Sequence, residues 1–372
     1  MRKVLVLALI AGVAALAIDA AVGEGPGHGD GGRFERSGAT ATWTTVFKSQ
    51  FNLEGLTAGP DGNLYTTLRN PGPCKVIGIS PTSTDPTAAT VVGFVPTPCS
   101  PSGLAFGPDG ALYVTGVGSA KDTIVRLVPD ADAPPTGVPY ATHVAQANGI
   151  AFDDHGNLWA SDGSAAVGTV WEVPPGGGAG VEAFRVPAML NDHGIGRTVF
   201  TTGNANPQAI VTNGLAFTHD GDLLVGDTAR GAVWRVQLDE NGTVLSPEGC
   251  DPTYAADALC LDDVLVQHPY LEGVDGITLD RAGDIWAAAN ERNAIVVVAK
   301  DGSVQEFFRN PADPTTGSRS AGPLETPTSP VVIGHTFCVA QSDNGRRDNN
   351  PNTAGEVANG GKVSCLDQPI EP

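Results

Sequence analysis

Six polar residues recur at one position of a repeated segment, just before the apolar run of each copy. They are Glu54, Ser102, Asn148, Asn213, Asp275 and Ser329. Four of them carry carboxylate or amide oxygens, and none is His or Cys. Two carboxylates and two amide carbonyls form an all-oxygen set of net negative charge, which suits Ca²⁺ at about six or seven coordination. Mg²⁺ and Mn²⁺ are the alternative ions.

Turn chemistry is the competing explanation of this column, because Asn-Gly and Asp-Gly are common turn dipeptides. The turn of each repeat, however, lies six or seven residues further along the chain, and Glu54 is a poor turn residue. We therefore expect Glu54, Asn148, Asn213 and Asp275 to be metal ligands. Four protein ligands leave coordination positions where a substrate oxygen can be polarised, which favours an enzyme.

The segments that carry this column repeat along most of the chain. Each begins with Gly and a short apolar strand, continues through a tight turn of the Asp-Gly type, and enters a second strand. The copies are Gly55-LTAGPDGNLY, Gly103-LAFGPDGALY, Gly149-IAFDDHGNLW, Gly214-LAFTHDGDLL and Gly276-ITLDRAGDIW. A sixth copy without the Asp-Gly turn is predicted at Thr328-SPVVIGHTFCVA.

The spacing of the copies predicts the fold. The repeated glycines lie about 46 to 65 residues apart, and a further strand pair follows most hairpins. Four strands per unit at a period near 50 are typical of propeller blades, so we predict an all-β, six-bladed β-propeller with a central channel. The two longer intervals predict insertions over the channel, at 176–208 and 246–273.

The composition agrees with a turn-rich β protein. The chain has 48 Gly and 29 Pro among 372 residues. Its 41 acidic and 21 basic residues give a formal net charge of −20, which argues against nucleic acid and an anionic membrane surface as partners. A small-molecule substrate fits better, and a closed propeller is expected to be a monomer.

The N-terminus has the features of an export signal. Arg2 and Lys3 precede an apolar run over 4–18, and about 15 apolar residues are short of the roughly 20 that span a membrane. We therefore expect a secreted or periplasmic protein without a membrane anchor after signal cleavage. The expected organisation is a signal peptide (1–23), a flexible lead-in (24–40) and the propeller (41–368).

Six cysteines fit an exported protein, because disulfides persist in oxidising compartments. Fifteen pairings are possible, and the simplest joins sequence neighbours, with a bond between adjacent strands for the last pair. These pairs are Cys74 with Cys99, Cys250 with Cys260, and Cys338 with Cys365. A zinc site is the alternative, but no CxxC occurs.

The repeats resemble the family of senescence marker protein, gluconolactonase and luciferin-regenerating enzyme. The resemblance covers roughly 46–366 and rests on four segments: Leu53-Glu54-Gly55, Ala147-Asn148-Gly149-Ile150-Ala151-Phe152, Thr212-Asn213-Gly214-Leu215-Ala216-Phe217 and Val274-Asp275-Gly276-Ile277. In that family a Glu of the first blade, two Asn of the middle blades and an Asp of the fifth hold a divalent ion, usually Ca²⁺.

The resemblance implies roles for this column. It assigns the metal to Glu54, Asn148, Asn213 and Asp275, and it implies that Asp275 is also the catalytic base or nucleophile. The implied activity is hydrolysis of a lactone or related ester. Leu56 stands where the family usually has Pro, and the residues that position a sugar lactone in the family have no clear counterpart here, so the substrate stays open.

Three residues are predicted to contact substrate: Ser102 in the column, and His193 and Arg197 in one insertion. The alternative for His193 and Arg197 is a solvated loop. Asp162 and Asp227 end second strands, where hydrogen bonding to nearby backbone is the expected role.

Two other functions compete with the hydrolase. One is a non-catalytic secreted propeller of the NHL type that binds protein or glycan. The other is a propeller lyase, for which a channel His such as His193 would be needed.

Overall fold

The computed structural model describes residues 41–188, 209–315, 319, 322–342 and 360–370. The chain divides into two compact units, 1–36 and 37–372, and every described residue belongs to the second. The predicted signal peptide and lead-in lie outside the described residues.

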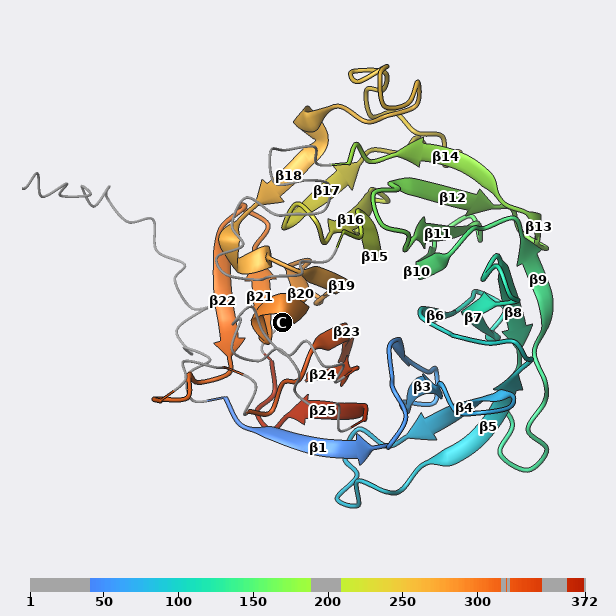
Figure 1. Cartoon of the computed structure of the whole chain (residues 1–372), viewed down its shortest axis with the longest axis vertical. Coiled ribbons are helices and arrows are strands. Elements are labelled where there is room, and N and C mark those ends of the chain that lie inside the picture. The colour runs from blue at the N-terminus through green and yellow to red at the C-terminus, as the bar shows by residue number, and fades with distance from the viewer. Residues whose placement is uncertain (1–40, 189–208, 316–318, 320–321, 343–359, 371–372) are drawn as a thin grey trace, which may run out of the picture. The chain divides into compact units, whose positions relative to one another are not determined.

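Six antiparallel sheets surround a central axis, which confirms the predicted all-β, six-bladed propeller (Figure 1). The first strand of each repeat lies innermost, and neighbouring inner strands contact one another around the ring. Blade 1 contains β2 (Leu56–Ala58), β3 (Leu64–Leu68), β4 (Cys74–Ile79) and β5 (Thr90–Val95). Blade 2 contains β6 (Leu104–Phe106), β7 (Leu112–Val117), β8 (Thr123–Leu127) and β9 (Val138–Thr142). A two-residue parallel strand, β13 (Gly178–Ala179), is added to β9.

The other blades follow the same order from the axis outward. Blade 3 contains β10 (Ala147–Phe152), β11 (Leu158–Asp162), β12 (Thr169–Val173) and β14 (Val181–Arg185). Blade 4 contains β15 (Thr212–Phe217), β16 (Leu223–Asp227), β17 (Ala232–Val236) and β18 (Val264–Gln267). Blade 5 contains β19 (Val274–Leu279), β20 (Ile285–Ala289), β21 (Ala294–Val298) and β22 (Val304–Arg309). The described residues also form the short 3-10 helices η2 (Leu261–Asp263), η3 (Pro269–Leu271) and η4 (Asn290–Arg292).

Blade 6 closes the ring with strands from both ends of the propeller. It contains β23 (Pro327–Ile333), β24 (Thr336–Gln341), β25 (Lys362–Leu366) and β1 (Trp43–Lys48). The predicted sixth copy is therefore confirmed, and β1 supplies its outermost strand by pairing with β25. Cys338 of β24 faces Cys365 of β25 and is bonded to it. The other two neighbour pairs are also disulfides, so the predicted pairing is confirmed.

The tight turns follow the sequence closely. Five turn glycines have left-handed backbone: Gly62, Gly110, Gly156, Gly221 and Gly283. A residue with a side chain is strained in this region of conformational space, whereas Gly is not. These turns lie at the far end of each inner strand from the polar column, so the two features are separated by the length of the strand.

The repeated glycine that begins each copy has a different role. A Cβ on Gly149 would overlap the backbone carbonyl oxygen of Asn213 in the next blade, and a Cβ on Gly214 would lie 2.6 Å from that of Asp275. Gly55, Gly103 and Gly276 make the same approach to the blade that follows each of them. These glycines therefore let the inner strands approach closely enough to bring the column together.

Gly149→Ala is expected to destabilise the propeller by about 1 to 3 kcal/mol, because the added methyl group meets backbone that cannot move independently. Gly78→Ala in β4 is the matched control, since its Cβ would lie in ordinary contact, 3.7 Å from Val92. Urea unfolding of both variants measures the difference. Equal stability of the two variants would contradict the close-approach role of Gly149.

Apolar clusters between adjacent blades form the core. Trp159 and Trp234 are fully buried in one such cluster, which joins blades 3 and 4. Trp286 of blade 5 packs on Phe337 of blade 6. These tryptophans therefore contribute to packing between blades.

The insertions are shorter than predicted, because β14 lies within 176–208 and β18 within 246–273. The part of the second insertion around the Cys250–Cys260 disulfide lies at the outer rim (Figure 1). There Leu259 donates to the carbonyl of Arg185 at the end of β14. Its predicted place over the channel is therefore wrong. Among the described residues, no helix is long and apolar enough to cross a membrane.

Candidate metal centre

A backbone irregularity turns the column residues out of their strands. In blade 3, Ala147 pairs with Asp162 and Ile150 with Ala160, so Asn148 and Gly149 together face one residue, Ser161. The same bulge contains Asn213 in blade 4 and Asp275 in blade 5. Bulges re-aim side chains beside functional sites, and here three in succession direct polar groups toward one another.

The bulge also exists in blade 6, between Pro327 and Pro330. There the carbonyl of Thr328 approaches Gly276, as the carbonyl of Asp275 approaches Gly214. The column position in blade 6 is therefore Thr328, and the prediction of Ser329 is wrong by one residue. The Thr328 hydroxyl donates to the backbone carbonyl of Glu54 at 2.6 Å and so joins blade 6 to blade 1.

The two predicted amide ligands contact each other directly. Asn148 Nδ2 donates to Asn213 Oδ1 at 2.8 Å, although 65 residues separate them. Asn213 Nδ2 donates to the hydroxyl of Thr228 at 3.1 Å, and that hydroxyl donates to the carbonyl of Val274 at 2.6 Å. The amides of blades 3 and 4 are thus fixed against the strand that carries Asp275.

The two predicted carboxylate ligands share this site. Asp275 is 6 % exposed, and Asn290 Nδ2 donates to its Oδ2 at 2.8 Å. Burial raises the pKa of Asp275 well above its usual range, and the charge of Glu54 raises it further. Burial also raises the pKa of Glu54, against the lowering effect of Arg69 and Lys121. A buried carboxylate whose pKa is raised by a second, half-buried carboxylate forms a site that a cation would stabilise.

Arg69 is the nearest charged partner of Glu54. Its Nη2 lies 3.4 Å from Glu54 Oε2 and donates to the hydroxyl of Ser102 at 3.2 Å. Its Nε donates to the carbonyl of Pro101 at 2.8 Å. The structure therefore places Ser102 beside Glu54 through Arg69, at the side of the site that blades 1 and 2 form.

A second polar column, which the sequence pattern did not reveal, consists of the residues that directly follow the second strands. Arg69 follows β3, Thr228 follows β16 and Asn290 follows β20. In blade 3 this position is Gly163, where a Cβ would lie 3.0 Å from that of Asn148. The end of a second strand lies opposite the start of the first, so reading both ends of each hairpin together would have found these partners.

The donor set fits an oxygen-binding divalent ion. The described residues contain no group of three or more His, Cys, Asp or Glu side chains that could hold a metal. A metal at this site would therefore take amide as well as carboxylate oxygens, and Ca²⁺ accepts both. Glu54, Asn148, Asn213 and Asp275 supply such oxygens from four blades.

Other predicted residues lie outside this centre. Asp162 accepts a hydrogen bond from the backbone of Ser164, and Asp227 accepts from the backbone of Arg230. Burial raises the pKa of Asp227 to about 6, although Arg230 lowers it. These contacts confirm the expected hydrogen bonding to local backbone. His193 and Arg197 lie outside the described residues.

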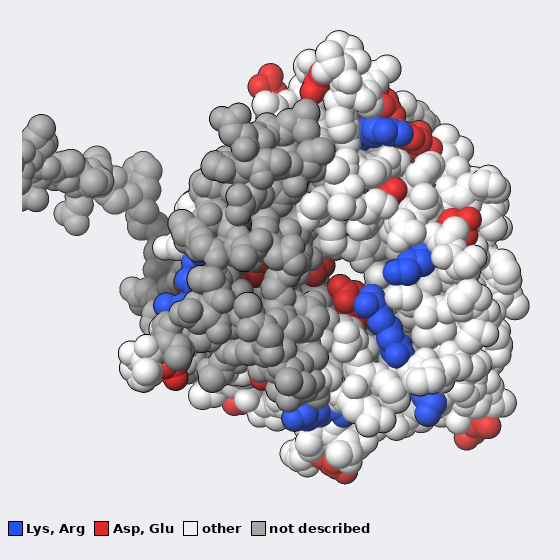
Figure 2. Space-filling view, in the orientation of Figure 1, with Lys and Arg blue, Asp and Glu red and all other residues white. Residues whose placement is uncertain are grey.

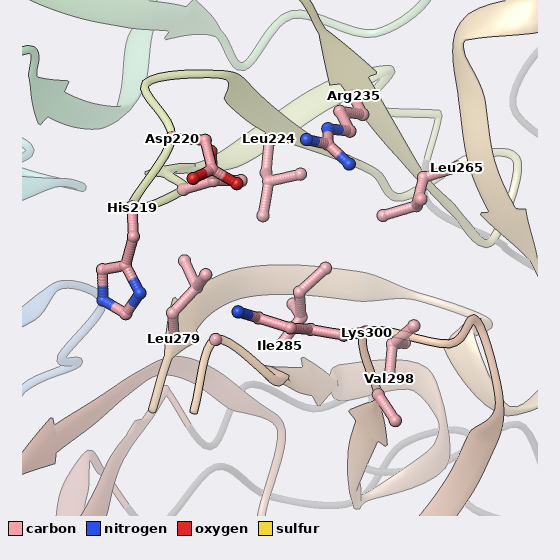
Figure 3. Close-up of a pocket in the computed structure, with 12 residues that line it drawn as sticks. His219, Asp220, Leu224, Arg235, Leu265, Leu279, Ile285, Val298 and Lys300 are labelled. Carbon is pink, nitrogen blue, oxygen red and sulfur yellow. The ribbon is translucent and has the colours of Figure 1, made fainter. Parts of the chain in front are cut away.

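A cavity of about 150 Å³ lies between blades 4 and 5 at the end that carries the tight turns (Figure 3). His219 and Asp220 lie at one side, with Leu224 and Ile285 between the two sheets. No member of the polar column lines this cavity, so it is separate from the candidate metal centre.

The comparisons with known proteins agree with the fold and with part of the resemblance. Residues 200–320 match the family model described as the SMP-30/Gluconolactonase/LRE-like region. This match confirms the resemblance stated above for that part of the chain, which contains Asn213 and Asp275. Among curated proteins, none matches the chain.

Three solved structures share the architecture. A gluconolactonase from Xanthomonas campestris is 16% identical over 88% of this chain and 89% of its own, with a TM-score of 0.51. The calcium-binding protein regucalcin from Agrobacterium tumefaciens is 17% identical over 88% and 96%, with a TM-score of 0.52. A PQQ-bound aldose sugar dehydrogenase from Streptomyces coelicolor is 16% identical over 88% and 98%, with a TM-score of 0.55. At these identities the similarity shows the propeller fold alone.

Proposed function

We propose that this chain is a secreted or periplasmic, divalent-metal-dependent hydrolase of lactones or related esters, with Ca²⁺ as the favoured ion. The observation that carries the proposal is the meeting of a buried and a half-buried carboxylate with two amides at one centre. The charge of Glu54 raises the pKa of Asp275 there, and Asn148 contacts Asn213. The match of 200–320 to a family model that includes gluconolactonase supports the reaction class. Three disulfides fit an oxidising compartment.

Glu54, Asn148, Asn213 and Asp275 would hold the ion. A bound Ca²⁺ supplies a Lewis acid that polarises the carbonyl of the ester and lowers the pKa of a nearby water. Asn290 holds one oxygen of the Asp275 carboxylate at 2.8 Å, which orients Asp275 to accept a proton from the attacking water at its other oxygen. Thr228 and Asn148 fix the Asn213 amide.

The reaction balances without a further reactant. The water oxygen bonds to the carbonyl carbon, the bond from that carbon to the ring oxygen breaks, and the ring oxygen takes the proton that Asp275 received. The product is an open hydroxy acid, which ionises at neutral pH.

Calcium calorimetry on the mature, disulfide-bonded protein tests the metal centre first. We expect one site in the wild type, and its loss in both Asp275→Ala and Asn213→Ala, because each variant removes a ligand. Ser329→Ala is the matched control, since Thr328 and not Ser329 holds the column position in blade 6. This control is expected to bind Ca²⁺ as the wild type does.

The opposite result is equally informative. No Ca²⁺ binding by the wild type, or binding that neither ligand variant changes, would exclude this centre. A non-catalytic secreted binding propeller would then become the leading function.

A further inference from the structure

Two cations lie on one side of the candidate metal centre of a strongly acidic protein. The formal net charge of the chain is −20, yet Arg69 of blade 1 and Lys121 of blade 2 both act on Glu54. Figure 2 shows basic side chains next to acidic ones beside the central opening. The loop that bears Lys121 turns sharply, with left-handed backbone at this residue.

The guanidinium of Arg69 is held in place from three directions. Pro101 accepts from its Nε, Ser102 accepts from its Nη2, and Glu54 lies 3.4 Å from Nη2. The side chain is 28 % exposed. Among the described residues Nη1 has no hydrogen bond or ion pair, so one arm of the fork can bind a ligand.

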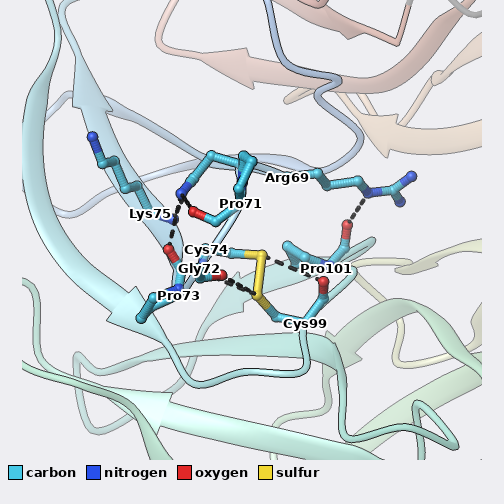
Figure 4. Close-up of a disulfide and its surroundings, with 9 residues drawn as sticks. Arg69, Pro71, Gly72, Pro73, Cys74, Lys75, Cys99 and Pro101 are labelled. Atoms are coloured by element: carbon cyan, nitrogen blue, oxygen red, sulfur yellow. Dashed lines mark hydrogen bonds between the residues drawn. A yellow bond between two sulfur atoms is a disulfide. The ribbon is translucent and has the colours of Figure 1, made fainter.

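A disulfide anchors both segments that hold this arginine (Figure 4). The Cys74–Cys99 bond joins the start of β4, at the end of the loop that begins with Arg69, to the segment before β6. The backbone N–H of Cys74 also lies 3.0 Å from the Cys99 sulfur. Arg69 and Pro101 are thereby fixed relative to each other, which pre-organises the guanidinium.

The charges of the loaded centre decide which ligand fits. A divalent cation would balance the two charges of Glu54 and Asp275, and Arg69 and Lys121 would then leave the centre positive. An anionic ligand is attracted to such a site, and a guanidinium fork matches a carboxylate in shape. Once a divalent metal ion neutralises Glu54 and Asp275, Arg69 and Lys121 are no longer needed as counter-ions of Glu54.

We propose that the substrate is a lactone that carries a carboxylate, which Arg69 binds and Lys121 attracts. This inference rests on the function proposed above and narrows its substrate class. Ring opening proceeds as described there, and the substrate carboxylate takes no part in bond making or breaking.

Two probes that differ only in charge test the inference: 5-oxotetrahydrofuran-2-carboxylate and its carboxamide. For the Ca²⁺-loaded wild type we expect the carboxylate to be favoured at least about 100-fold in kcat/KM.

Arg69→Met should bring the ratio of carboxylate to carboxamide near one, mainly through the KM of the carboxylate. Arg69→Lys should restore part of the ratio, and Lys121→Met should lower it less and in a salt-dependent way. Lys75→Met, at an exposed position of β4, is the control and should keep the wild-type ratio.

Binding provides a readout that does not depend on turnover. We expect tetrahydrofuran-2-carboxylate, the analogue without the lactone carbonyl, to bind Ca²⁺-loaded wild type by calorimetry, and Arg69→Met to bind it at least about tenfold more weakly. Ca²⁺ calorimetry on the same Arg69→Met sample separates the two proposals. A retained Ca²⁺ site with no preference for the carboxylate in binding or turnover would overturn this inference alone, whereas a wild type without a Ca²⁺ site would overturn the proposed function.

Discussion

Asp275→Asn is expected to lower kcat by about 10²- to 10⁴-fold, the usual contribution of a positioned general base. The amide retains an oxygen for the ion and for the hydrogen bond from Asn290, but it cannot accept a proton from water at neutral pH. Ion binding should therefore weaken only in part. Acid release from the lactone that the wild type hydrolyses best, followed at constant pH, measures the loss.

Asp280→Asn is the control for this experiment. Asp280 lies in the same blade and is also buried, but it accepts from the indole of Trp286 at the turn end of the hairpin. Its substitution should change stability and leave kcat within about threefold of wild type. Full activity of Asp275→Asn would exclude the proposed base, and an equal loss in both variants would mean that Asp275 acts through the fold.

The repeats predicted the fold because each carries two independent constraints. The turn glycine needs left-handed backbone, and the glycine that opens the copy needs the absence of a side chain. Gly62 and Gly149 illustrate the two. Both constraints are local in sequence, so a single chain reveals them.

Blade 6 was misread by one residue because it lost the glycine that opens the copy: Ser329 stands at that position, although the turn glycine Gly334 keeps left-handed backbone. Pro330 stands where the other copies have a strand residue after Gly, and the turn at Gly334 has no Asp before it. Only the strand pairing with β24 places Thr328 at the column position. The outer strands β14 and β18 were assigned to insertions for a similar reason, since neither belongs to the repeated hairpin.

The second column cannot be recognised from single strands, because its residues belong to a different strand from the first column. Arg69 and Asn290 have no motif of their own, and their role follows from antiparallel pairing with the start of the inner strand. The contact of Asn148 with Asn213 also depends on the curvature of the ring, which brings bulges of successive blades together.

The same carboxylates predict that Ca²⁺ binding reverses the order of stability of the wild type and Asp275→Asn. Without an ion, burial raises the pKa of Glu54 and Asp275 in the folded state, and the charge of Glu54 raises that of Asp275 further. The folded protein then holds these protons more tightly than the unfolded chain does. Their contribution to stability is therefore fully present below the unfolded pKa values and is lost as the pH rises through the raised ones.

Asp275→Asn removes this repulsion, so without Ca²⁺ it should unfold at a higher temperature than wild type. The difference should amount to about 2 to 4 °C for each kcal/mol of repulsion removed, and it should grow as the pH is raised from 5 to 8. Calorimetric melting in a chelator, at several pH values, measures it.

Saturating Ca²⁺ should reverse the order. At about 1,000 times Kd, a ligand that binds only the folded state stabilises it by about 4 kcal/mol, which corresponds to a rise of roughly 10 °C for the wild type. The variant, with one charge fewer in its site, should gain less. The Asp280→Asn control should differ from wild type by the same amount with and without the ion. An equal rise in the melting temperature of the wild type and of Asp275→Asn would mean that Ca²⁺ binds elsewhere. Only at a site that contains Asp275 does the charge of this residue affect both the melting temperature and metal binding.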